Sequence, residues 1–197
     1  MPATFAMPYL ALPLRSSLSS SRLALAIIAL AVATVVFTVS GADIAANFSK
    51  FFAVTLAGWW FLQFFEAVTW VLLVAVLIVP VDIYSVARGP TKTIVEQEPQ
   101  VFDALSVGFP VPGEHGAAQL GLPDVMFFAL FLGACSRFRL RLGWTWLAMT
   151  LSFGATLAIA VQWDVSGLPA LPLLSVAFVL VNADLLWRGL REQRLGL

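Results

Sequence analysis

Long apolar runs with very few charges recur along this sequence and limit what it can fold into. A helix needs about 20 mainly apolar residues to cross the ~30 Å hydrocarbon core of a bilayer, and Leu23–Val39 and Val68–Ala87 approach that length. Hydrophobic residues make up 60% of the chain, far more than a water-soluble surface allows. Backbone groups in lipid must be paired internally, and the runs lack the alternation of barrel strands. The sequence therefore predicts an all-α, polytopic transmembrane helical bundle.

Charges and turn residues divide this bundle into about six spans. Ser49–Ala87 is nearly continuous apolar sequence, and as a single helix its roughly 39 residues would measure about 58 Å. We therefore predict a hairpin of two spans that breaks near Phe65–Ala67, where Glu66 falls. The predicted spans are about 23–40, 48–65, 67–87, 121–138, 144–162 and 168–187, inside a membrane domain of 22–187 with a polar loop at 88–119 and tails at 1–21 and 188–197.

The basic start of the chain allows a second interpretation of the first run. A basic segment followed by an apolar one also fits a cleaved signal peptide, but this run is longer than a usual signal core, which favours a retained helix.

The distribution of basic residues predicts the orientation. With six spans, both termini and the turn at 137–141 share one side, which carries Arg15, Arg22, Arg137, Arg139, Arg141, Arg188, Arg191 and Arg194. The other side carries Lys50, Arg88 and Lys92. The positive-inside rule therefore places both termini in the cytoplasm and the 88–119 loop outside. Asn182 and Asp184, late in the last run, are expected to contact interfacial water or Arg188.

Composition also argues against several functional classes. The formal net charge is zero and the aromatic residues lie within apolar runs, so a nucleic-acid partner is not indicated. Cys135 and His115 are the only residues of their kinds, which leaves no cysteine cluster and no two-histidine metal site. We expect no metal and no cofactor. The expected partners are the lipid bilayer and other membrane proteins, and a homo-oligomer fits the same features.

Two isolated aspartates within apolar runs are the candidate functional residues. Asp82 is the only charge in Val68–Ala87, and Asp124 is the only charge in Leu120–Gly133. A lone charge in a membrane segment costs about 2.5–3.5 kcal/mol on insertion scales, so it indicates a functional site by default.

The residues alone leave three roles open for these aspartates. Two carboxylates within a few ångströms share a proton, so one can act as a base on water while the other polarises a peptide carbonyl, as in aspartic proteolysis. The same pair could bind protons or cations in a carrier. Each could instead stabilise a helix end, because Pro123 followed by an acid is ordinary at a helix start.

Three separated stretches resemble the presenilin and signal peptide peptidase clan of intramembrane aspartyl proteases. AVLIVPVDIYSVARGPTKTIVE (Ala75–Glu96) is similar to the presenilin stretch that carries the first catalytic aspartate. LGLPDVMFFALFLG (Leu120–Gly133) resembles the GxGD stretch with the second aspartate. Gly167–Pro172 contains PALP at the start of the last span, as in presenilins.

This resemblance covers about Asn47–Leu186 and implies a fold like the last six of the family's nine helices. It also implies an aspartic endopeptidase that hydrolyses peptide bonds within transmembrane helices of a substrate protein. Asp82 and Asp124 would be the catalytic pair, and the 88–119 loop would border substrate entry. The implied substrate-binding residues are Gly121, Leu122, Pro123, Pro169, Ala170, Leu171 and Pro172.

Two positions depart from the family pattern. Val81 stands where the family has a tyrosine before the first aspartate, and Pro123 replaces the second glycine of GxGD. Proline fixes φ near −65° and removes an N–H donor, which changes how Asp124 can face Asp82. The two alternatives to a protease are thus a proton- or cation-coupled carrier and a catalytically inactive protein that binds transmembrane helices.

Overall fold

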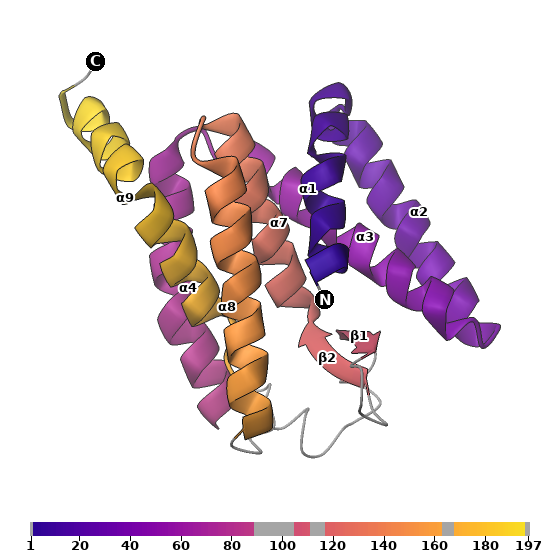
Figure 1. Cartoon of the computed structure of the whole chain (residues 1–197). Coiled ribbons are helices and arrows are strands. Elements are labelled where there is room, and N and C mark those ends of the chain that lie inside the picture. Colours follow the sequence, from indigo (N-terminus) through magenta and orange to yellow (C-terminus); the bar gives the residue numbers. More distant parts are fainter. Residues whose placement is uncertain (1, 89–104, 111–116, 163–167, 196–197) are drawn as a thin grey trace. The chain divides into compact units, whose positions relative to one another are not determined.

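The computed structural model describes residues 2–88, 105–110, 117–162 and 168–195. These residues form seven α-helices, one short 3-10 helix and a two-stranded hairpin (Figure 1). The elements are α1 (Pro2–Ser17), α2 (Ser20–Val39), α3 (Asp43–Phe61), η1 (Leu62–Phe64), α4 (Val68–Arg88), β1 (Ser106–Pro110), β2 (Ala117–Gly121), α7 (Leu122–Arg137), α8 (Leu142–Gln162) and α9 (Leu171–Leu195). The all-α prediction is confirmed for the membrane segments, and the hairpin is an addition to it.

Four of these helices are long and apolar enough to cross a membrane: α2, α4, α8 and α9. The chain is therefore a multi-pass integral membrane protein. Helices α3 and α7 occupy the other two predicted spans, but α3 carries Asp43 and Lys50, and the 16 residues of α7 cover only about 24 Å. The predicted break near Glu66 is confirmed, because η1 ends at Phe64 and α4 begins at Val68.

Three predicted boundaries are corrected by the structure. The expected tail 1–21 contains α1, whose Phe5 and Leu12 are buried even though Pro8 and Pro13 lie inside the helix. The expected C-terminal tail 188–197 continues α9 as far as Leu195. The polar loop 88–119 contains β1 and most of β2, and its remaining residues, apart from Arg88 and Leu105, lie outside the described part of the chain.

The chain divides into two compact units. Unit 1 comprises Met1–Phe64 and Glu98–Leu130, and unit 2 comprises Phe65–Gln97 and Phe131–Leu197. Helix α7 runs from unit 1 into unit 2.

In unit 1, α2 and α3 pack against each other as a helical hairpin. Ser19 caps α2, because its hydroxyl accepts the backbone N–H of Arg22. Gly41, with φ at +73°, makes the turn into α3, a conformation that costs glycine little. The core of this unit includes Trp59, whose indole Nε1 donates to the carbonyl of Ala129 in α7 over 3.1 Å.

In unit 2, α9 packs against both α4 and α8 (Figure 1). The rings of Phe131 and Phe178 stack at 4.5 Å between centroids and are fully buried. Gly189 of α9 lies against Val68 at the start of α4, where an added Cβ would be 2.9 Å from a Val68 methyl carbon. The end of unit 2 that holds this contact also holds most of its arginines, and we call it the basic end: Arg137, Arg139, Arg141, Arg188 and Arg191.

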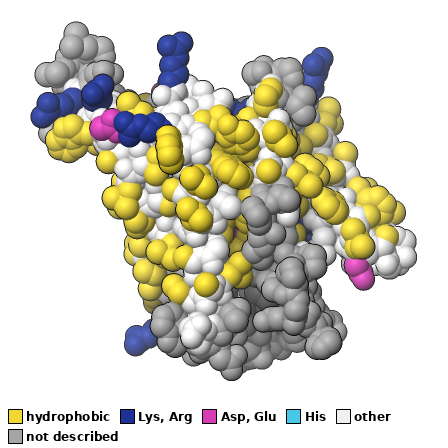
Figure 2. All heavy atoms as spheres, viewed as in Figure 1, with side chains coloured by type: hydrophobic (Ala, Val, Ile, Leu, Met, Phe, Trp, Pro, Cys, Tyr) yellow, Lys and Arg dark blue, Asp and Glu magenta, His cyan; other side chains and the backbone are white. Residues whose placement is uncertain are grey.

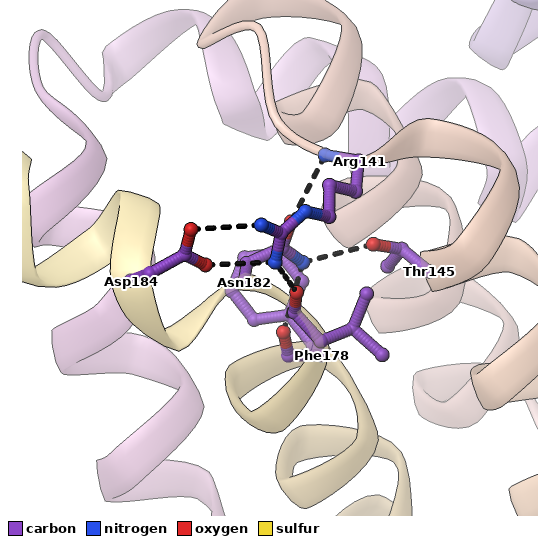
Figure 3. A network of polar contacts seen from close by, with 6 residues as sticks. Arg141, Thr145, Phe178, Asn182 and Asp184 are labelled. Atoms are coloured by element: carbon purple, nitrogen blue, oxygen red, sulfur yellow. Dashed lines mark hydrogen bonds and ion pairs between the residues drawn. The ribbon is translucent and has the colours of Figure 1, made fainter.

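A polar network holds α8 to α9 at the basic end (Figure 3). The Arg141 guanidinium donates to both Asp184 oxygens at 2.7 Å, and its backbone N–H donates to Asn182 Oδ1 at 3.0 Å. The buried Asn182 amide donates in turn to Thr145 Oγ1 at 2.8 Å and to the Phe178 carbonyl at 2.9 Å. The predicted partner of Asp184, Arg188, is thus wrong. The antiparallel packing of α8 on α9 brings Arg141 to Asp184 instead.

We expect Asn182→Leu to lower the free energy of unfolding by about 1–3 kcal/mol, because it leaves the buried Thr145 hydroxyl and the Arg141 N–H without their partner. Thermal unfolding in detergent measures this loss. Leu180→Ala, at a side chain of α9 that is 71% exposed, is the matched control and should change the midpoint much less. Equal effects of the two variants would contradict a stabilising role for the network.

Candidate functional site

The first predicted catalytic residue lies in the C-terminal half of α4, within unit 2. Asp82 is half-buried and follows Pro80, which sits inside the helix. Proline cannot donate the usual intrahelical hydrogen bond, so the backbone is weakened about two turns before the end of α4. Val81, which replaces the family's tyrosine, is 63% exposed, and Tyr84 is 65% exposed. Gly89–Glu96, the rest of the first motif, lies outside the described residues.

Asp82 contacts the predicted substrate loop directly. Its Oδ2 accepts the backbone N–H of Leu171 over 3.2 Å, although the two residues are 89 positions apart in the chain. Leu171 is the first residue of α9, and the first N–H groups of a helix have no partner within it. A carboxylate is favoured there by both the free donor and the helix dipole. The contact therefore fixes the PALP segment against Asp82.

The PALP segment runs into the start of α9, which begins at Leu171 and not at the predicted residue 168. Ala170 and Leu171 are buried, whereas Pro169 and Pro172 are partly exposed. The carbonyl of Ala170 accepts the N–H of Leu174 over 3.2 Å, which closes the first turn. Pro172 has no N–H group, and none is needed in the first turn of a helix. Gly167, the first residue of the quoted motif, lies outside the described part of the chain.

The second predicted catalytic residue lies in the first turn of α7, within unit 1. Asp124 is half-buried, and its Oδ2 lies 3.2 Å from the position that a Cβ on Gly121 would take. A larger residue there would crowd this carboxylate, which would have to shift by a few tenths of an ångström. Pro123 is exposed and lies in the first helical turn. N–H groups of this turn have no partner within the helix, so a proline here costs no hydrogen bond.

The hairpin leads straight into Asp124. Strands β1 and β2 pair antiparallel with Ser106 opposite Gly121, and the N–H of Leu122 donates to the Leu105 carbonyl over 3.0 Å. Lys50 Nζ of α3 donates to the Ser106 carbonyl over 3.2 Å, so α3 anchors the strand. This hairpin was not predicted from the sequence. Pro112-Gly113 between Ser106–Pro110 and Ala117–Gly121 was the available turn signal.

The structure thus groups the predicted site residues into two sets. Asp82 lies with the PALP residues of unit 2, and Asp124 lies with Gly121, Leu122 and Pro123 of unit 1. The network of Arg141, Asn182 and Asp184 is separate from the first set along α9 and stabilises the helix pair. No family model, curated protein or solved structure matches the chain, so the resemblance to presenilins is carried by the three short motifs alone.

Proposed function

We propose that this protein is an intramembrane aspartyl protease that cleaves transmembrane helices of substrate proteins. The observation that carries the proposal is the hydrogen bond from Leu171 N to Asp82 Oδ2. It joins the first proposed catalytic carboxylate to the segment that resembles a substrate-binding loop.

The chemistry needs only the two carboxyl groups and water. When Asp82 and Asp124 meet, they share one proton, because two like charges at short range cannot both ionise easily. The ionised carboxylate takes a proton from water, whose oxygen adds to the peptide carbonyl carbon. The protonated carboxyl donates to the carbonyl oxygen and stabilises the charge that develops on it. The C–N bond then breaks, the leaving amine takes the proton that the first carboxylate accepted from water, and the proton on the carbonyl oxygen returns to the second carboxylate.

The meeting of Asp82 and Asp124 is part of the proposal and is supported by the two sequence motifs that carry them. The proposed arrangement has six spans, with α3 and α7 as the two spans beside α2, α4, α8 and α9.

The substrate would bind as an extended strand. A helical substrate hides its carbonyls in its own hydrogen bonds, so it must be locally unwound before hydrolysis. Among the described residues, β2 pairs only with β1, and Lys50 of α3 binds the Ser106 carbonyl of β1, so the proposed added strand lies along the edge of β2. A strand added to such an edge gains main-chain hydrogen bonds. Because β2 ends at Gly121, the added strand would pass close to Asp124.

The basic end defines the proposed orientation. With the positive-inside rule, its arginines support an orientation in which that end lies in the cytoplasm and, with six spans, both termini lie there too.

The test of the proposal compares the wild-type protein with Pro123→Gly in liposomes that contain a single-span substrate, with products identified by mass spectrometry. We expect both to cleave, with rates within about tenfold, because Pro123 uses no N–H and its ring is exposed. The glycine variant should also unfold more easily, by about 0.4–1 kcal/mol, since it gains freedom in the unfolded state.

The other outcomes distinguish the alternatives. Cleavage by Pro123→Gly alone would mean that the natural protein binds helices without cutting them. If neither protein cuts any of several substrates, the protease proposal fails. Uptake of ions into the same liposomes that depends on pH and is lost in Asp82→Asn would then identify a carrier.

A further inference from the structure

The described side chains at the basic end of unit 2 carry a net positive charge. They include five arginines and two acids, Asp184 of α9 and the exposed Glu66 before α4. Asp184 is occupied by Arg141 in a two-pronged ion pair. Figure 2 shows basic side chains gathered at the upper end of α9. Arg139 and Arg188 are exposed at this end.

Arg139 occupies a backbone position that does not favour arginine. Its φ is +55°, the one positive value among the described residues other than glycine, in the short turn between α7 and α8. Glycine or asparagine adopts this left-handed conformation at lower cost. A charged, exposed side chain at such a position is an outlier that points to a function of the charge itself.

Aromatic side chains set the depth of these arginines in the bilayer. Trp144 and Trp187 are 68% and 60% exposed and lie at the same end of α8 and α9. Exposed tryptophans at the ends of membrane helices sit at the level of the lipid headgroups. The Arg191 guanidinium lies over the Trp187 ring at 5.6 Å, so this arginine is held at that level too.

We propose that the basic end of unit 2 is a binding surface for anionic phospholipid headgroups, with Arg139 and Arg188 as its principal contacts. Guanidinium groups bind phosphate through paired N–H donors, and the headgroup phosphates lie at the depth that the tryptophans define. The anionic lipids of the cytoplasmic leaflet match the excess charge. This inference is independent of the proposed proteolysis.

The experiment measures binding of phosphatidylglycerol and phosphatidylcholine to the full chain in detergent by native mass spectrometry. We expect the wild type to prefer phosphatidylglycerol, and we expect Arg139→Gly and Arg188→Gln each to lower that affinity about fivefold. The matched control is Arg88→Gln, which removes one exposed arginine from the other end of α4 and should stay within about twofold of the wild type.

Arg139→Gly should fold at least as well as the wild type, because glycine suits the backbone at this turn. If that variant nevertheless fails to fold, Arg188→Gln still decides the question. The proposal is overturned if the wild type shows no preference for phosphatidylglycerol. It is also overturned if Arg88→Gln lowers the affinity as much as the other two variants do. It is also overturned if free glycerol phosphate competes as well as the lipid does, because the surface would then bind phosphate and not a membrane headgroup.

Discussion

Asp82→Asn is expected to abolish substrate cleavage while leaving the protein folded. Asparagine keeps an oxygen that can accept the N–H of Leu171, so the contact that holds the PALP segment survives. It removes the ionisable group, and loss of general acid–base catalysis typically costs about 10²–10⁴-fold in rate. Asp124→Asn should have the same effect, because the proposed chemistry needs both carboxyl groups.

Asp82→Ala separates the structural role of this residue from the proposed catalytic one. Alanine removes both the charge and the acceptor, which leaves the Leu171 N–H unpaired and should lower the unfolding free energy by about 1–3 kcal/mol. Cleavage products measured by mass spectrometry and thermal unfolding in the same detergent give both quantities. Asp82→Asn should therefore match the wild type in stability but match Asp82→Ala in activity.

The control is Glu66→Gln, the same exchange of carboxylate for amide at an exposed position before α4. It should keep both stability and activity. Full cleavage by either asparagine variant would contradict the proposed pair. A loss of folding in Asp82→Asn equal to that in Asp82→Ala would mean that the carboxylate serves the helix end and nothing more.

The helical part of this fold could be predicted because the local pattern of apolar and charged residues decides which segments form membrane helices. The break near Glu66 was predicted correctly, since a charge inside a 39-residue apolar stretch marks where a helix can leave the membrane. The first helix, α1, was not predicted, because it contains Pro8 and Pro13, and prolines usually interrupt helices. Burial of Phe5, whose ring lies 4.8 Å from that of Phe128, outweighs that local cost.

The contacts of the candidate site could be predicted only in part, because they depend on packing between distant segments. The short motifs identified Asp82 and Leu171, but not that one accepts the other's N–H across 89 residues. Likewise, Asp184 was expected to contact interfacial water or Arg188, whereas antiparallel packing supplies Arg141, 43 residues away. Sequence patterns show which side chains need partners, and the tertiary fold decides which partners they obtain.

Gly58→Ala is expected to be among the most destabilising single substitutions in unit 1. A Cβ at this position would lie 2.5 Å from the Met126 carbonyl oxygen and 3.2 Å from the Leu130 nitrogen. Both are backbone atoms of α7, which cannot rotate away as a side chain can. Forcing extra volume into a packed contact typically costs about 1–3 kcal/mol, and a backbone clash belongs at the upper end.

The close approach at Gly58 also positions the candidate site. It lets Trp59 Nε1 reach the Ala129 carbonyl, and both contacts hold α3 against the helix whose first turn carries Asp124. Gly58→Ala should therefore displace α7 and reduce cleavage as well as stability. Trp59→Phe removes the indole donor while the Ala129 carbonyl keeps its place in the helix, so it should cost about 0.5–1.5 kcal/mol for the lost hydrogen bond and preserve more activity.

Gly154→Ala is the matched control for Gly58→Ala. Gly154 lies in α8, is exposed, and has nothing within 4 Å of an added Cβ. Alanine is the better helix former by about 0.8–1.0 kcal/mol, so this variant should be as stable as the wild type or more so. Thermal unfolding of the two glycine variants in one detergent gives the comparison. If both raise the midpoint, α3 and α7 do not approach as closely as Gly58 allows, and α3 does not fix the start of α7.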